Sequence, residues 1–244
     1  MSEPTSSSPA DSPATRRRQA RADTTRLSLL DAAVHEFAAH GFEGASTRAI
    51  ATRAGTHQPQ INYHFESKDV LWRAAVDHVF GKLDAALDAQ QFAGIGADEI
   101  TRERLADAIR AIVRAVAHLP ELNRIMIQEA TADSDRLAWI VERHTRGRYD
   151  LLSEAWNSLR TRGLVADIDE TVVYYALIGA SSLAYVNAPE ARHLLGPGAI
   201  DDAFVEAHAS CGAFRFGAEE HGDQGVGVGP VSYTHLRAHE TTSL

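Results

Sequence analysis

The chain has 244 residues and a formal net charge of −9, with 44% hydrophobic and 23% charged residues, proportions that exclude a collagen-like, a coiled-coil-only or a wholly disordered protein. Its single cysteine, Cys211, excludes an intramolecular disulfide and any zinc site built from cysteines, and it favours a reducing compartment. The first nineteen residues contain no apolar run of the kind found in signal peptides, so we expect a cytoplasmic protein.

The charge is distributed unevenly along the chain. Between Arg16 and Lys68 there are eight basic and five acidic residues, whereas from Leu71 onward there are sixteen basic and twenty-five acidic residues. DNA affinity depends on the local patch that displaces counterions and not on the net charge of the whole chain. An acidic body can therefore carry a basic DNA-binding segment at its N-terminal end.

Residues 1–23 are rich in Ser, Pro, Ala and Arg and lack apolar periodicity, which predicts a disordered basic arm. Three fates are open for its arginines, Arg16, Arg17, Arg18 and Arg21. They could enter a minor groove, attract phosphates without sequence preference, or remain solvated, and a solvated tail is the commonest fate of a short charge run.

Four helices are expected next. Apolar residues at helical spacing over 27–37 predict a first helix that stops at Gly41. Ser46 offers an N-cap to a short second helix, which Gly55 ends. A third short helix follows directly, and Ser67 caps a long fourth helix with an apolar stripe.

The remainder of the chain is also predicted to be helical. A glycine-containing break over 92–96 precedes helices expected over 105–119, 121–131, 134–162, 169–187 and 201–216. Because no stretch alternates with a period of two and no hairpin dipeptide occurs, we predict an all-α protein.

The segment over 171–189 is uncharged for nineteen residues, which is close to the length of a membrane span. It contains Thr, Ser, Tyr and Asn and lacks a basic flank. Ala176, Ala180 and Ala184 form a stripe of small residues that lets another helix approach closely. We therefore favour a buried or dimer-interface helix and expect no membrane association.

The two short helices around Gly55, preceded by a longer amphipathic helix, have the pattern of a helix-turn-helix. In that motif the second helix lies in the major groove of DNA. Here its sequence, HQPQINYHF from His57, is rich in amides and free of acids, which suits adenine edges and avoids repulsion by phosphates. Taken alone, the same segment could equally be a short polar surface helix.

A longer pattern decides between these alternatives. Residues 25–76 carry Gly41-Phe42, Ser46-Thr47, Ala51, Ala54-Gly55, Tyr63-His64-Phe65 and Ser67-Lys68 in one continuous register. This run closely resembles the N-terminal domain of TetR-family transcriptional regulators. The resemblance implies a three-helix DNA-binding domain over 24–80, followed over 81–217 by a helical ligand-binding and dimerisation domain. It further implies a homodimeric regulator, more often a repressor than an activator, that an unidentified small molecule releases from a palindromic double-stranded DNA operator.

The resemblance also implies which residues contact DNA: Thr47, Arg48, Gln58, Pro59, Gln60, Asn62, Tyr63, His64 and Lys68. Arg48 falls where relatives reach a base edge or a phosphate, and the positions from 58 to 62 fall where they touch bases. Thr47, Tyr63 and Lys68 match phosphate-holding positions, while Ile61 and Phe65 should pack inward. His64 either contacts a phosphate or packs in the helix junction. His57 departs from the family pattern, so the operator cannot be inferred from those of relatives.

The larger domain offers pocket candidates only by residue type, because ligand pockets are apolar with a few polar groups. The candidates are Met126, Gln128, Trp139, Arg143, His144, Tyr149, Tyr174 and Tyr175. Each is more often a core or surface residue than a ligand contact.

Searches for other chemistry find little. The twelve histidines include no HExxH pattern, and no thiolate pair is available, so we expect no metal and no cofactor. The segment over 179–183 lacks the closing glycine of a nucleophile elbow, and the glycines over 225–229 lack the lysine of a phosphate loop. We therefore expect that the protein is not an enzyme. The alternatives are an adaptor or a small-molecule enzyme without specific DNA binding, and gel-shift titration would distinguish them.

The C-terminal residues form two further segments. Residues 218–229 are a glycine-rich tail, and residues 230–241 read PVSYTHLRAHET, which matches a translated transposase adapter from sequencing libraries. We expect residues 230–244 to be a sequencing artefact, with a genuine disordered tail as the alternative.

Overall fold

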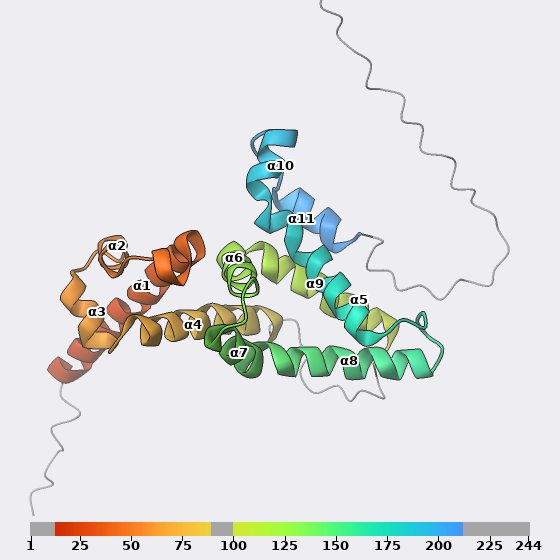
Figure 1. Ribbon diagram of the computed structural model, residues 1–244, viewed down its shortest axis with the longest axis horizontal. Helices are drawn as coiled ribbons and strands as arrows, with labels where there is room; N and C mark the ends of the chain where they lie inside the picture. Colours follow the sequence, from red (N-terminus) through yellow and green to blue (C-terminus); the bar gives the residue numbers. More distant parts are fainter. Residues whose placement is uncertain (1–12, 89–99, 212–244) are drawn as a thin grey trace, which may run out of the picture.

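The computed structural model describes residues 13–88 and 100–211. Regular structure in these two ranges is entirely helical, which confirms the all-α prediction for them (Figure 1). The helices are α1 (Pro13–Gly44), α2 (Thr47–Arg53), α3 (Gln58–His64), α4 (Lys68–Asp88), α5 (Arg102–Ala117), α6 (Pro120–Glu129), α7 (Asp135–Ile140), the π-helical η3 (Val141–Thr145), α8 (Arg146–Thr161), α9 (Glu170–Val186), α10 (Ala188–Leu195) and α11 (Asp202–Ala209).

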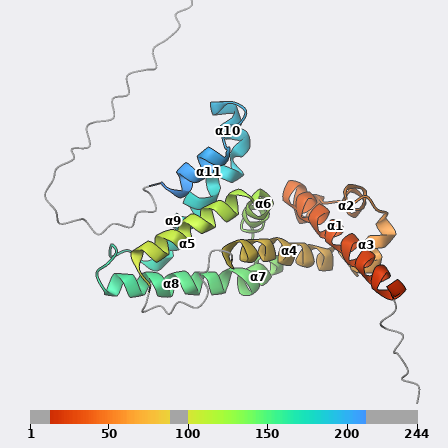
Figure 2. The same ribbon diagram turned by 180° about the vertical axis from the view of Figure 1, so that it is seen from behind.

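The helices are arranged along one long axis. Helices α1 to α3 gather at one end, and α4 leads from them toward the remaining helices, as both ribbon views show (Figures 1 and 2). The domain boundary expected between residues 80 and 81 falls inside α4, which runs unbroken across it. The end formed by α1 to α3 is therefore continuous, through one helix, with the rest of the protein.

The start of α1 corrects one expectation. The helix begins at Pro13, so the prediction of a disordered arm is wrong for residues 13–23, while residues 1–12 lie outside the described part. Proline is tolerated in a first helical turn, and the Ala, Arg and Gln that follow are strong helix formers. Gln19 Nε2 also donates a hydrogen bond to Asp23 Oδ1, one turn further on, at 3.0 Å.

The expected boundaries of the helix-turn-helix are confirmed. Gly41 and Gly55 adopt left-handed φ values of 68° and 67°, which glycine reaches without steric cost. The hydroxyls of Ser46 and Ser67 each accept a hydrogen bond from a backbone N–H three residues on, at 3.4 and 3.1 Å. These caps satisfy N–H groups that have no partner within the helix.

The later helices differ from expectation in detail. The single helix expected over 134–162 is divided into α7, η3 and α8, and α10 was not predicted. Helix α11 ends at Ala209, short of the expected residue 216. The expected break at 92–96, the end of the helix beyond residue 211, the glycine-rich tail and the suspected artefact lie outside the described residues.

Two apolar cores hold the protein together. The first combines α1 to α4 with Ala115, Leu122, Ile125 and Ile140 from α5, α6 and α7. The second gathers α5, α8, α9 and α11 around Trp156, whose Nε1 donates to the Ile168 carbonyl oxygen at 2.8 Å. Burying each large aliphatic side chain contributes on the order of 1.5–3 kcal/mol. The core around α1 to α4 is thus completed by residues from α5, α6 and α7.

The described helices were compared with the length and hydropathy of membrane-spanning helices. Within the described ranges, no single helix combines the length and apolar character needed to cross a bilayer. Helices α9 and α10 reach those criteria only when taken together, across a bend of 62°.

Candidate nucleic-acid interface

Helix α3 presents polar side chains outward from an apolar anchor. Ile61 and Phe65 are 2% and 3% exposed and pack into the first core, as expected. The four side chains of α3 that were expected to contact bases are all exposed: Gln58, Pro59, Gln60 and Asn62. Amides fixed on a short helix in this way can donate and accept hydrogen bonds together, which matches the pattern at adenine edges.

The start of α2 lies against the start of α3. Gln58 Nε2 donates to Thr47 Oγ1 at 3.4 Å, and Arg48 follows Thr47 as an exposed residue. Two of the residues expected to contact DNA therefore meet at one corner of the surface, and Arg48 is next to them in the chain. This geometry allows one phosphate or base edge to be approached from both helices.

A shallow hollow of about 680 Å³ adjoins this corner and is lined by Glu36, Ser46, Arg48, Ala49, Thr52 and Arg53. The Glu36 carboxylate in this hollow already has a hydrogen-bond partner, since its Oε1 accepts a hydrogen bond from the Ser46 N–H at 3.3 Å. Thr52 and Arg53 were not among the expected DNA contacts. Helical spacing could have identified Thr52, because it lies one turn after Arg48 on the same face.

The end of α3 carries Tyr63, which is 70% exposed, and His64, whose ring centroid lies 4.9 Å from that of Tyr63. Burial lowers the pKa of His64, the positive charge of Arg26 lowers it further, and Asp23 opposes this shift. The neutral imidazole is therefore favoured. This favours the packing alternative for His64 over an ionic contact with phosphate.

Lys68 is half-buried at the start of α4 and already has partners. Its Nζ donates to the Glu43 carbonyl oxygen at 3.2 Å and lies 5.0 Å from the centre of the Phe42 ring. A contact between Lys68 and a phosphate would have to be made alongside these interactions or in exchange for them.

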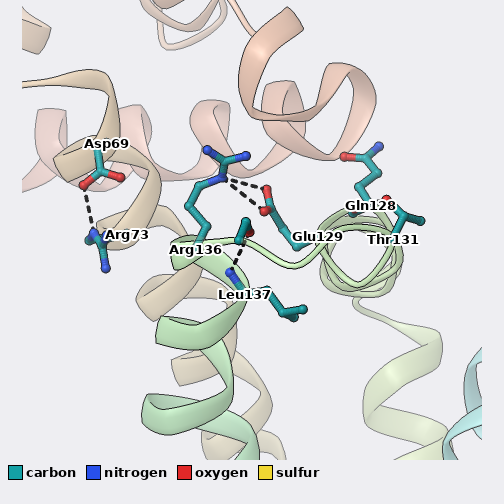
Figure 3. A network of polar contacts seen from close by, with 8 residues as sticks. Asp69, Arg73, Gln128, Glu129, Thr131, Arg136 and Leu137 are labelled. Atoms are coloured by element: carbon teal, nitrogen blue, oxygen red, sulfur yellow. Dashed lines mark hydrogen bonds and ion pairs between the residues drawn. The ribbon is translucent and has the colours of Figure 1, made fainter.

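A polar network connects α6 and α7 to the first core (Figure 3). Arg136 Nε donates to both carboxylate oxygens of Glu129, at 3.1 and 3.2 Å. The Arg136 guanidinium also lies 4.2 Å from the centre of the Phe42 ring and 5.8 Å from that of Trp72. Beside it, Gln128 Nε2 donates to the carbonyl oxygen of Ala38 on α1 at 3.0 Å.

The eight candidate pocket residues do not converge on one cavity. Met126, Gln128 and Trp139 pack against the first core or α1, and Arg143 and His144 face Asp77 on α4, at 2.6 and 2.8 Å. The three tyrosines lie on α8 and α9. Tyr149 and Tyr174 are in edge-to-face contact, Tyr149 and Thr171 share a hydrogen bond of 3.1 Å between their hydroxyls, and Tyr175 is 69% exposed.

A second hollow, of about 270 Å³, lies between α4 and the α5–α6 segment and is lined by Lys82, Ala86, Ala111, Arg114, Ala115, His118 and Leu119. Neither described hollow is lined by any of the eight candidates. Their role in ligand binding stays a prediction.

Helix α9 has two apolar faces. One face, which includes Val173, Leu177 and Tyr185, is buried in the second core. The other face exposes Val172, Tyr175, Ile178 and Leu183, each more than 45% exposed, together with Ala176 and Ala180, while Ala184 is half-buried. An exposed apolar surface of this kind marks a site of protein association.

The described residues contain no group of three or more His, Cys, Asp or Glu side chains placed to hold a metal ion.

Comparison with known proteins bears directly on the helix-turn-helix. The profile of bacterial regulatory proteins of the tetR family matches residues 29–75, which include α2, α3 and the start of α4. This part of the chain is therefore a TetR-type helix-turn-helix.

Two proteins similar to this chain are transcriptional regulators. The chain is 35% identical over 69 residues to the transcriptional repressor NicS of Pseudomonas putida, a match that spans 28% of the chain and about a third (32%) of NicS. It is 24% identical over 193 residues to the transcriptional regulator RutR of Escherichia coli K12, covering 78% of this chain and 87% of RutR.

Solved structures share the fold. A TetR family transcription regulator from Marinobacter aquaeolei VT8 superposes with a TM-score of 0.58 at 21% identity, over 81% of this chain and 97% of its own. A TetR-like regulator from Rhodococcus sp. RHA1 gives 0.52 at 21% identity, over 76% and 93%. The resemblance seen in the sequence is confirmed, and the protein is a DNA-binding transcriptional regulator and not an enzyme.

Proposed function

We propose that this regulator is a cytoplasmic homodimeric repressor that a small molecule releases from a palindromic DNA operator. The observation that carries the proposal is the exposed amide surface of α3, which Ile61 and Phe65 anchor from beneath. Repression is supported by the name of NicS, a transcriptional repressor similar to this chain over its N-terminal part.

The two kinds of DNA contact divide between two sets of side chains. Gln58, Gln60 and Asn62 read base edges, because an amide can bond the adenine N6 and N7 positions at once. Arg48, Thr47, Tyr63 and Lys68 hold phosphates, which set the register of the protein and carry no sequence information. Thr52 and Arg53 extend this phosphate-binding surface along the hollow beside α2.

The exposed apolar face of α9 forms the dimer interface. Ala176 and Ala180 allow the same helix of a second copy to approach closely, and the large apolar side chains beside them lose their contact with water. A two-fold dimer presents two α3 helices to half-sites about 34–36 Å apart, so the operator is palindromic.

Release follows from the attachment of α4 to both parts of the protein. A ligand bound in the larger domain changes the angle at which α4 carries the DNA-binding end, so the two α3 helices no longer match successive major grooves. The ligand acts only through its difference in affinity for the two states, and a hundredfold difference amounts to about 2.7 kcal/mol.

Binding-site selection on the purified full chain, followed by gel-shift titration of the DNA upstream of its own gene, tests the proposal. We expect a palindromic consensus, and we expect Gln60→Ala and Asn62→Ala to change it. Asn187→Ala, an exposed amide at the end of α9, is the matched control and should leave the consensus unchanged. A wild-type consensus from both α3 variants would show that these amides do not read bases.

A further inference from the structure

Helix α1 extends well beyond the three-helix core that it helps to build. Its first buried residue is Leu29, whereas all residues from 13 to 21 are exposed. At about 1.5 Å per residue, the helix runs roughly 24 Å from Pro13 to Leu29. Residues 13–21 therefore contribute no buried side chain to the core and can contact another molecule.

Three of the four arginines on this extension lie on one side of the helix, and Arg16 falls outside that group. At 3.6 residues per turn, Arg17, Arg18 and Arg21 fall within an arc of about 100°. Gln19 and Asp23, which are hydrogen bonded to each other, lie outside that arc, and no acidic residue occurs from Pro13 to Ala22. The three exposed guanidinium groups therefore form a cationic edge without a compensating carboxylate in the same stretch of helix.

The extension starts beside the recognition helix. The Arg26 guanidinium lies 5.3 Å from the centre of the Phe65 ring, and both Arg26 and Asp23 act electrostatically on His64 at the end of α3. Both ribbon views show the N-terminal end of α1 next to α3, at the end of the protein away from α5 to α11 (Figures 1 and 2). Arg21 lies five residues, or about one and a half helical turns, further out than Arg26 and on another side of the helix.

We propose that residues 13–21, the arginine extension, bind the DNA phosphates that flank the half-site read by α3. The inference rests on the proposed function. A helix with side chains is about 10–12 Å in diameter, whereas the minor groove is about 6 Å wide. The extension is therefore too thick, as a helix, to thread that groove, and its arginines reach the backbone from outside.

Phosphate contacts of this kind change affinity and its salt dependence, and they leave sequence preference unaltered. Each phosphate neutralised adds about 0.9 to the slope of log K against log salt concentration. Three arginines therefore account for a slope of up to about 2.7 per protomer, or about 5.4 for the dimer on its operator. The contact also requires DNA beyond the half-sites, which makes affinity depend on the length of the flanks.

The test uses the full chain with Arg17→Gln, Arg18→Gln and Arg21→Gln combined, since glutamine preserves helix propensity while removing charge. The control combines Arg102→Gln, Arg104→Gln and Arg192→Gln, which are exposed and remove the same charge elsewhere. Gel shifts are measured over a salt series on the selected operator, with long flanks and with flanks trimmed to the half-sites, and circular dichroism monitors the fold.

We expect the extension variant to show a shallower salt slope, a wild-type consensus and no further loss of affinity on trimming. The control should behave as wild type. A wild-type slope in the extension variant, or an equal loss on trimming in variant and wild type, would overturn the inference while leaving the proposed function standing. Failure of the wild-type chain to select any DNA would contradict the proposed function and the inference together.

Discussion

The pair formed by Arg136 and Glu129 joins α7 to α6 where Arg136 also lies against Phe42 and Trp72 of the first core, and it gives the sharpest stability prediction. The Glu129 side chain is only 7% exposed and the Arg136 side chain 26%. Arg136→Ala removes the cation from a buried carboxylate and removes its contact with Phe42 as well. Breaking a buried pair at one partner costs about 3–5 kcal/mol. Because Arg136 is partly accessible, we expect a loss near the lower end, about 3 kcal/mol.

Urea unfolding followed by circular dichroism measures this loss. Arg136→Met combined with Glu129→Gln should be less destabilised than Arg136→Ala alone, because no buried charge is left without a partner. Arg146→Ala is the control, since Arg146 pairs with Glu142 on an exposed helical surface, where such a pair contributes less than about 1 kcal/mol. If Arg136→Ala cost no more than Arg146→Ala, the reasoning about this junction would be refuted.

Three further predictions concern other parts of the protein. Ala180→Glu should produce a monomer that loses specific operator binding, and sedimentation as an intact dimer would count against the α9 interface. Burial lowers the pKa of His144 from its usual 6.5, against an opposing effect of Asp77, so its contribution to stability is complete above pH 6.5 and is lost as pH falls through the folded pKa. His144→Phe should keep the stacking on Phe80 and flatten the dependence of unfolding free energy on pH between 7 and 5, and an unchanged slope would contradict this assignment. Lys68→Ala should weaken binding to all sequences alike and reduce the salt slope by about one per protomer, whereas an altered consensus would show that Lys68 takes part in base reading.

The helix-turn-helix was predictable because its signals are local. Ser46 and Ser67 cap helices through N–H groups three residues away, and Gly55 supplies a left-handed turn that depends on its own backbone. Ile61 and Phe65 are four residues apart, so helical periodicity places both on the buried side of one short segment and the polar residues on the other side. For this part of the fold, and for the exposed face of α3, neighbouring residues contain the necessary information.

The arginine extension shows how composition can mislead. The serines and prolines of residues 1–12 made the whole N-terminal stretch look disordered, although residues 14–23 consist largely of good helix formers. Helix propensity summed over that shorter window, together with the spacing of Gln19 and Asp23, could have predicted the helix. The error came from treating one biased segment as uniform.

By itself, the sequence determined the helical class, the recognition helix and its exposed amides, because each depends on residues within a few positions of one another. Only the tertiary structure decided the surroundings of the candidate pocket residues. Gln128 bonds to Ala38, ninety residues earlier, and Arg143 pairs with Asp77, sixty-six residues earlier. Residue type indicates that such polar side chains need hydrogen-bond or ionic partners, but long-range packing determines which partners lie within reach. Helices far apart in the chain come together because their apolar faces are buried against each other.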